Sequence, residues 1–376
     1  MTKKKGSTMT VCPPLKVVVL LCAILLTLAI LLFHSDEFKL IQSSNFTYQF
    51  KNNGFGHSHG FHSPPKIAFL FLTRKKLPLD FLWANFFKNG DQAKFSIYIH
   101  SQPGFVYDKS NTKSPIFYNR QLNNSVQVLW GESTMIEAER LLFSAALDDP
   151  ANQRFVLLSD SCIPLHNFSH TYNYLMSSRK SFVDSFFNVD EGRYNPKMLP
   201  VISQEKWRKG SQWITLVRRH AEMVVNDEII FPLFKKFCKR WPPADHDTGR
   251  KTTEKHHPNC IPDEHYVQTL LSIRGLDDEL ERRTLTYSTW NSSIPKEDKR
   301  SWHPVTFYYP DATPQTIKEI KEINHIDFES EHRTEWCSVN SKYTSCFLFA
   351  RKFTPGAGLR ILEKDSSENP VDGKHG

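Results

Sequence analysis

The sequence predicts an α/β fold with a central, mostly parallel sheet, preceded by a single N-terminal transmembrane helix. Two observations carry this prediction. From about residue 66, short apolar runs typical of buried strands alternate with segments of helical periodicity, and one long apolar run precedes them. The chain has 376 residues, of which 39% are hydrophobic and 13% aromatic, which is enough to form a core. This composition excludes a chain that is disordered throughout.

The individual strands and helices follow from local patterns. An apolar run bounded by Pro65 and Arg74 is typical of a buried strand, and similar runs recur along the first half of the chain. The clearest helix begins at Thr134, where Thr134 and Glu137 form a capping-box pattern ahead of an apolar stripe. We expect strands over 66–73, 94–101, 126–130, 154–160 and 181–187, and helices over 78–90, 134–148 and 263–274.

The functional surface is expected at one edge of this sheet, because ligands of such sheets bind beyond the carboxyl ends of the strands. Residues 73–76, 100–104 and 159–164 follow three of the expected strands. The third of these segments contains one acid, Asp160, which we expect near the substrate.

The long apolar run covers residues 17–33, in which Thr27 is the one polar residue. Its length is at the short end of what spans a hydrocarbon core. A cleaved signal peptide is the alternative, but its apolar region measures about 7–15 residues and is followed by a small-residue cleavage site. Lysines precede the run and acids follow it, which favours a cytosolic N-terminus. We therefore expect a type II membrane protein with its bulk in the lumen.

This topology divides the chain into five parts. The segment after the apolar run is rich in Ser, Asn, Gly and His and has no periodicity, which is typical of a flexible stem. The expected parts are a cytosolic tail at 1–16, a transmembrane signal-anchor at 17–33, a stem at 34–65, a lumenal domain at 66–362 and a disordered tail at 363–376.

Sequons and cysteines agree with a lumenal location. Five cysteines follow the apolar run, so at least one is free or pairs with another chain. Spacing suggests the pairs Cys238 with Cys260 and Cys337 with Cys346. Candidate glycosylation sites with N-x-[ST] spacing are Asn45, Asn123, Asn167 and Asn291.

The net charge argues against a nucleic-acid partner. The formal charge is +8, of which four lysines before residue 34 supply half. The remaining +4 is spread over the rest of the chain, whereas nucleic-acid binders cluster their positive charge.

Several common chemistries lack their motifs in this chain. It contains no G-x-x-x-x-G-K-[ST], no H-E-x-x-H and no G-x-S-x-G. Its one D-x-D, Asp245-His246-Asp247, lies in a polar loop, whereas acids that hold a metal against a diphosphate need rigid support.

Two acids at an expected helix start are candidates for a general base. Asp263 and Glu264 both fall on the margin of the apolar stripe of the helix over 263–274, so either could border a cleft. Periodicity does not choose between them. The alternative is structural, because acids in a first turn are favoured by the helix dipole alone.

Two cations lie within the apolar run 347–353. Successive strand residues face opposite ways, so one of Arg351 and Lys352 is expected to point inward. A cation in such a place needs an anion, either a buried acid or a phosphate.

The order of these segments resembles the core-2/I-branching β-1,6-N-acetylglucosaminyltransferase family, and in particular its plant branch. The likeness runs from about residue 66 to 362 and includes IAFLFLT, SIYIHS, RFVLLSDSCIPL, KGSQW, CIPDEHYVQTLL and CFLFARKF. The resemblance implies a GT-A-like fold and type II Golgi topology. It also implies inverting transfer of a sugar from a nucleotide sugar, UDP-linked, to a glycan or glycoprotein without a metal or other cofactor.

The resemblance also implies roles for single residues. Glu264 in PDEHY matches the catalytic base, and Lys352 in FARKF matches the cation that neutralises the leaving diphosphate. Arg351 adjoins it, and Arg333 is the nearest candidate for a second basic partner. Trp213 in KGSQW lies where the family builds its acceptor side. Asp160 and Asp263 are expected to contact substrate.

One departure leaves the donor sugar and the linkage open. The animal enzymes read IHVD at the end of the second strand, where this chain has Ile99-His100-Ser101-Gln102. The alternative function is a catalytically inactive family member that binds glycans or scaffolds other transferases.

Overall fold

The computed structural model describes residues 64–187, 192–241, 257–291, 293, 303–328, 331–339 and 341–368, with the side chains of 364–368 left out. The expected cytosolic tail and anchor, residues 34–63 of the expected stem with Asn45, and the D-x-D lie outside these residues. Within the described part of the chain, no helix has the length and apolar character needed to cross a membrane.

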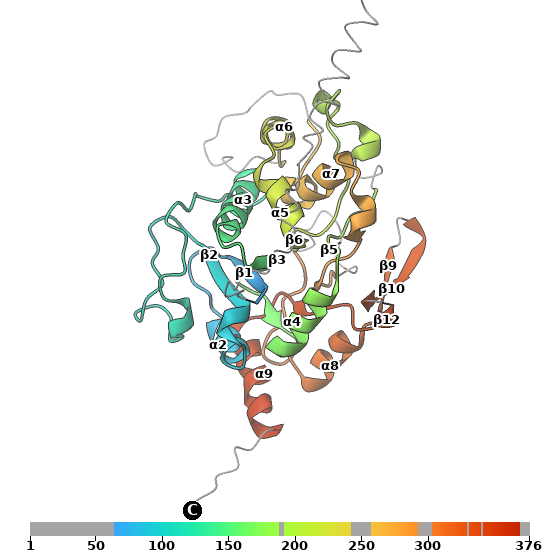
Figure 1. The fold of residues 1–376 in the computed structure, drawn as a ribbon. Helices are drawn as coiled ribbons and strands as arrows, with labels where there is room; N and C mark the ends of the chain where they lie inside the picture. Colours follow the sequence, from blue (N-terminus) through green and yellow to red (C-terminus); the bar gives the residue numbers. More distant parts are fainter. Residues whose placement is uncertain are drawn as a thin grey trace, which may run out of the picture. The chain divides into compact units, whose positions relative to one another are not determined.

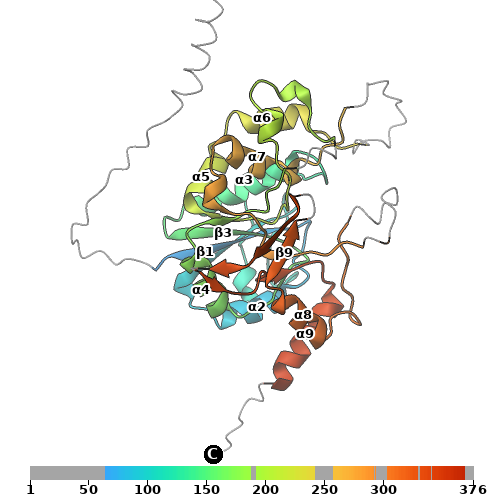
Figure 2. The same cartoon turned by 90° about the vertical axis from the view of Figure 1, so that its right-hand side faces the viewer.

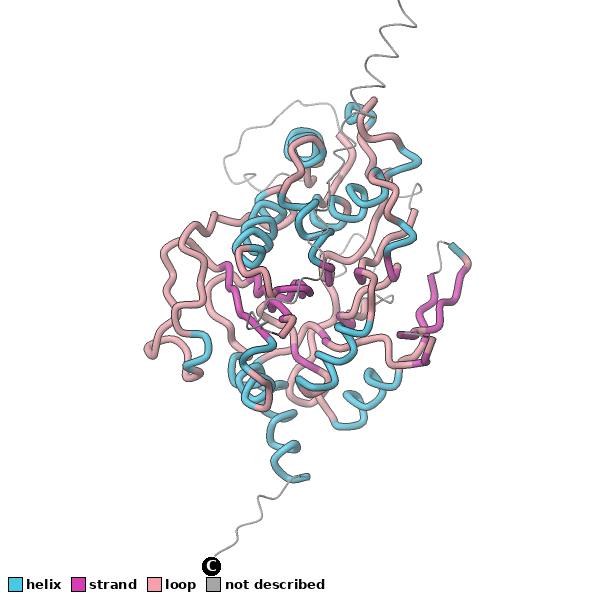
Figure 3. The backbone as a smooth tube through the Cα atoms, in the orientation of Figure 1, coloured by secondary structure: helices cyan, strands magenta, loops and turns pink. Residues whose placement is uncertain are grey.

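The main sheet has six strands. It lies at the centre of the fold (Figures 1 and 3). Its order is β2-β1-β3-β6-β5-β7, and β6 is antiparallel to both of its neighbours while the other pairings are parallel. The expectation of a mostly parallel sheet is therefore confirmed. The strands are β1 (Lys66–Leu72), β2 (Phe95–His100), β3 (Asn152–Ser159), β5 (Ser181–Phe182), β6 (Thr215–Val217) and β7 (Leu280–Glu281).

Helices cover both faces of this sheet (Figure 2). The alternation of β1 shows why: Phe69 and Phe71 pack into the core on the side of α2 and α4, whereas Ala68 and Leu70 pack on the side of α3, α5, α6 and α7. Since both faces of β1 are buried, its sequence is a continuous apolar run. The helices are α2 (Asp80–Lys88), α3 (Thr134–Leu147), α4 (Phe168–Ser177), α5 (Arg218–Val225), α6 (Ile230–Phe237), α7 (Tyr266–Ile273), α8 (Pro314–Glu322) and α9 (Pro355–Glu368).

Short strands join the end of the chain to the main sheet. In a second sheet, β13 lies between β4 and β8, and β4 directly follows the turn after β3. This pairing brings the segment after β3 close to the segment after β13. The short strands are β4 (Ile163–Pro164), β8 (Thr286–Tyr287), β9 (His325–Phe328), β10 (Arg333–Trp336), β11 (Ser338–Val339), β12 (Lys342–Tyr343) and β13 (Phe349–Ala350).

Two disulfides confirm the pairing that the spacing suggested. Cys238 pairs with Cys260, and Cys337 with Cys346, with Cα–Cα distances of 5.0 and 5.3 Å. Cys162 is buried and free.

Three local predictions were wrong in detail. Residues 126–130 form no strand; the backbone N–H of Val126 instead donates to Nε2 of His100, a pairing that depends on tertiary structure. The capping box fails because the hydroxyl of Thr134 accepts from the N–H of Leu129, outside the helix. The helix expected from 263 begins with a 3-10 turn, Pro262–Glu264, before α7. In addition, α9 covers the first residues of the expected C-terminal tail.

Candidate active site

One large cleft, of about 1390 Å³, opens at the carboxyl ends of the sheet strands. The segments after β5 and β7 line it, and so does the segment that leads into the antiparallel strand β6. The cleft therefore lies at the edge of the sheet where the functional surface was expected. However, the described lining comes mainly from the second half of the chain, and none of the expected segments 73–76, 100–104 and 159–164 contributes to it.

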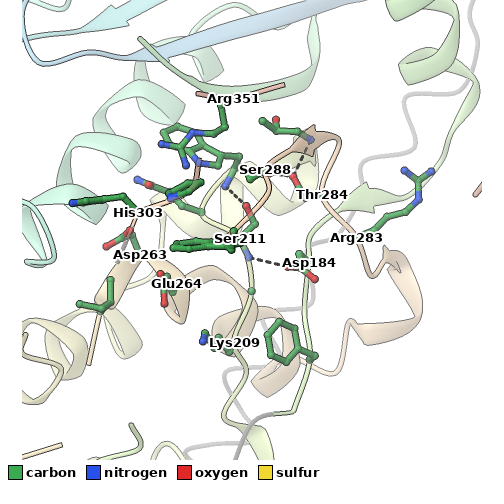
Figure 4. Close-up of a pocket in the computed structure, with 18 of the residues that line it drawn as sticks. Asp184, Lys209, Ser211, Asp263, Glu264, Arg283, Thr284, Ser288, His303 and Arg351 are labelled. Atoms are coloured by element: carbon green, nitrogen blue, oxygen red, sulfur yellow. Dashed lines mark hydrogen bonds between the residues drawn. The ribbon is translucent and has the colours of Figure 1, made fainter. Parts of the chain in front are cut away.

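Glu264 stands in one wall of this cleft (Figure 4). The 3-10 turn Pro262–Glu264 presents it, and the N–H of Gly210 donates to its backbone carbonyl at 2.9 Å. Nη1 of Arg193 donates to Oε2 of Glu264 at 2.7 Å, with both side chains partly exposed. The carboxylate of Glu264 is thus paired with a cation while it stays partly exposed in the cleft.

Asp263 lies beside Glu264 in a different environment. Its Oδ1 is buried and has no hydrogen-bond partner within the described structure. Burial, together with the adjacent charge of Glu264, raises the pKa of Asp263 to about 7. Asp263 is thus an acid that gives up its proton reluctantly, whereas Glu264 has a cationic partner.

A second buried acid, Glu139 of α3, was missed from the sequence. It is 2% exposed, and its Oε1 accepts a 2.7 Å hydrogen bond from Nε2 of the cleft residue Gln212. Burial, and then the charge of Asp263, raises the pKa of Glu139 well above its usual range. The sequence feature that could have identified Glu139 is its place among the apolar side chains of α3. A charged group buried there needs a hydrogen-bond or ionic partner.

Arg351 lies in the cleft (Figure 4), and its side chain packs against Trp213. Its guanidinium carbon is 4.5 Å from the centre of the Trp213 ring, and its Nε is buried without a hydrogen-bond partner in the described chain. Burial lowers the pKa of Arg351, and the charges of Cys162, Asp160 and Asp263 oppose this shift. A buried cation with an unused donor is suited to an anionic ligand.

Lys352 lines the same cleft and completes a cationic group. Burial, and then the charges of Arg351 and Arg74, lowers the pKa of Lys352 to about 8. Asp160 is the opposing acid; burial raises its pKa, although Arg74, Arg351 and Lys352 favour its charged form. The pairing of β4 with β13 brings Asp160 close to Arg351 and Lys352, and Arg74 after β1 lies near the same acid. Asp160 itself is not among the described lining residues of the cleft.

Arg333 is placed differently from the other predicted cations. Its guanidinium donates to Glu331 and Glu335 and covers the ring of Phe328 at 4.0 Å. Phe328 lines the cleft, but Arg333 is outside the lining that the structure describes. The β9–β10 hairpin thus supports the cleft wall through Arg333.

Asp184 is a further acid of the cleft that the sequence did not single out. Its Oδ2 accepts from the N–H of Ser211 at 3.1 Å (Figure 4), and burial raises its pKa to about 6. It lies within 181–187, where a strand was expected, but β5 ends at Phe182 and Asp184 follows it in a segment without regular structure.

Three of the predicted glycosylation sites lie among the described residues. Asn123, Asn167 and Asn291 are all exposed, so each is accessible to modification. Asn167 also caps α4, because its Oδ1 accepts from the N–H of His170 at 2.8 Å.

Two comparisons identify relatives of this chain. The model of the family described as Core-2/I-Branching enzyme matches residues 67–321. A rice protein (Oryza sativa subsp. japonica), named Glycosyltransferase BC10, is 54% identical over 305 residues, which cover 79% of this chain and 76% of that protein. The family match spans the six strands of the central sheet from Ile67 onward and the 3-10 turn that carries Glu264. The chain belongs to the core-2/I-branching enzyme family, in its plant branch, and is a glycosyltransferase.

Proposed function

We propose that this protein moves a sugar from a nucleotide-sugar donor, UDP-linked, to a hydroxyl of a glycan, with inversion and without a metal ion. The observation that carries the proposal is that one cleft contains both a carboxylate, Glu264, and the cations Arg351 and Lys352. Inversion needs one base and a stabilised leaving group, and this cleft offers both.

Glu264 is the proposed base. It accepts the proton of the acceptor hydroxyl while the oxygen attacks C1 of the donor sugar. Oε2 is engaged by Arg193, so Oε1 is the oxygen available for the proton. The bond between C1 and the diphosphate oxygen breaks with its electron pair leaving on the diphosphate.

Arg351 and Lys352 are the proposed partners of that leaving group. With a pKa of about 8, Lys352 is mostly charged at neutral pH, and a bound diphosphate favours its charged form further. Fixed cations in a partly dry cleft stabilise developing phosphate charge more than water does.

The location is also a proposal. The apolar run at 17–33 with lysines before it, and the exposed sequons, support a type II protein of the Golgi membrane with its cleft in the lumen.

The substitution Glu264→Gln tests the proposal. Loss of a general base lowers turnover by about 10²–10⁴-fold, so transfer from a panel of UDP-sugars to a glycan array is expected to disappear, with the melting temperature kept. Glu222→Gln is the control, because Glu222 pairs with Arg218 outside the described cleft lining. Unchanged turnover in Glu264→Gln refutes the role of Glu264.

A further inference from the structure

The cleft is larger than a single small ligand requires. Small-molecule pockets measure about 300–1,000 Å³, whereas this cleft measures about 1390 Å³. The proposed reaction uses Glu264, Arg351 and Lys352 for the base and the diphosphate. Space therefore remains for more of the acceptor than the sugar that carries the reacting hydroxyl.

Tryptophan is concentrated in this cleft. Four of the eight tryptophans of the chain are among its described lining residues. Trp213 is 6% exposed and lies under Arg351, so it belongs to the floor. Trp130 and Trp290 are 41% and 53% exposed. These two rings present apolar area to solvent within a binding cleft, where such area indicates a ligand.

Neighbouring side chains hold the ring of Trp130. The guanidinium carbon of Arg240 lies 5.3 Å from its centre, and the ring of His303 approaches it edge-on with centres 5.3 Å apart. Gly131 permits this packing: its φ is +73°, and a Cβ there would lie 2.7 Å from Cδ of Arg240. A ring that is already positioned loses little conformational entropy when a ligand binds.

The charge of the cleft favours an uncharged acceptor. Among the described lining residues six are basic and four are acidic, a formal excess of two positive charges. The negative charge of a bound donor's diphosphate offsets that excess. No net positive charge then remains in the cleft to attract a polyanionic acceptor. The basic residues are Arg193, Lys209, Arg240, Arg283, Arg351 and Lys352, and the acidic ones are Asp184, Asp263, Glu264 and Asp327.

We propose that Trp130 and Trp290 form an acceptor subsite on which pyranose rings of an uncharged, oligomeric glycan stack while a hydroxyl of that glycan reaches Glu264. A pyranose ring has an apolar C–H face that packs on an aromatic ring, and its hydroxyl rim bonds to polar side chains. Asn259 and Ser288 also line the cleft and offer such groups. The inference rests on the proposed function and adds to it the acceptor class, a chain several sugars long.

Calorimetric titration of the full-length protein, in a detergent without sugar head groups, tests the subsite. The probes are xylo-, cello- and β-1,4-galacto-oligosaccharides of two to six units, added with UDP present. In at least one series, Kd is expected to fall roughly tenfold or more from the dimer to the hexamer. Trp130→Ala and Trp290→Ala are each expected to weaken hexamer binding by roughly tenfold, and Trp130→Phe to keep most of it.

Trp336→Ala is the matched control, because Trp336 is 56% exposed but outside the cleft lining that the structure describes. It is expected to bind the hexamer as the wild type does. The subsite is overturned if oligosaccharides of all lengths bind with equal affinity in all three series. It is also overturned if Trp336→Ala weakens hexamer binding as much as Trp130→Ala and Trp290→Ala do. Because the titrations read binding and not transfer, they decide the subsite even where Glu264→Gln overturns the proposed base.

Discussion

Two adjacent acids in the cleft wall illustrate how environment separates side chains of similar chemistry. Glu264 has the guanidinium of Arg193 at 2.7 Å. Asp263 has a buried oxygen without a hydrogen bond and the buried acid Glu139 nearby, and its pKa rises to about 7. A general base must reach the proton that it takes. The partly exposed carboxylate of Glu264 is therefore better placed for that task than Asp263, which has a buried oxygen.

The raised pKa of Asp263 predicts a pH-dependent stability. Between its ordinary value of 3.8 and about 7, the folded protein binds this proton more tightly than the unfolded chain does, so the contribution of Asp263 to stability falls as pH rises through that window. Asp263→Asn removes this loss. The melting temperature of the wild type is therefore expected to fall more steeply from pH 5 to pH 8 than that of Asp263→Asn. Each kcal/mol of lost unfolding free energy corresponds to about 2–4 °C in melting temperature.

Asp278→Asn is the control for this comparison, since Asp278 is exposed. Its melting profile is expected to run parallel to that of the wild type. A parallel profile for Asp263→Asn as well contradicts the assigned environment of Asp263.

At the scale of elements, the segment that enters β6 positions the cleft wall that carries Glu264. The N–H of Gly210 donates to the carbonyl of Glu264, and its neighbour Ser211 donates to Asp184. A Cβ at Gly210 would lie 1.6 Å from the carbonyl oxygen of Asp184. Only glycine allows these backbones to approach so closely.

Gly210→Ala is expected to destabilise the fold by about 1–3 kcal/mol and to lower transfer, because the backbone under Glu264 must move. Urea unfolding measures the first effect as a lower midpoint. Gly356→Ala is the control: its Cβ would meet no atom closer than 3.8 Å, and α9 contains it. If both variants unfold at the wild-type midpoint, the close approach at Gly210 is not as described.

The sequence predicts those elements whose local pattern matches their final environment. The strand β1 and most of β3 are apolar runs buried on both faces, β2 alternates between buried and partly buried residues over most of its length, and α3 has a full apolar stripe. The strand β6 has three residues and runs against its neighbours, so its place depends on the rest of the sheet. For the same reason, residues 126–130 have strand composition but pair with a side chain instead.

The same distinction applies to the site. Arg351 and Lys352 could be predicted because they are cations within an apolar run. Asp263 and Glu264 could be predicted because they are adjacent acids at an expected helix start. That these four residues line one cleft could not be predicted from the sequence, because the fold brings them together. Asp184 and Trp130 fall in segments that were expected to be strands but are irregular in the structure, so the strand pattern gave no reason to choose them.

At the scale of the whole molecule, the sheet gathers segments from distant parts of the chain at one edge. The turn after β3 and the segment after β13 meet there because β4 pairs with β13. The disulfide between Cys238 and Cys260 ties the segments that bring Arg240 and Asn259 to the cleft. The wall that carries Glu264, the cations and the tryptophan rings therefore come from separate regions that only the complete fold unites.

The central claim is that fixed cations, and not a divalent ion, hold the departing nucleotide. Calorimetric titration of UDP into the full-length protein in EDTA at pH 7, where Lys352 is mostly charged, tests it most directly. We predict that UDP binds in EDTA and that Lys352→Ala weakens this binding roughly tenfold, as loss of a charge-assisted contact does. Binding that appears only when Mn²⁺ is added, or that is unchanged in Lys352→Ala, contradicts the claim.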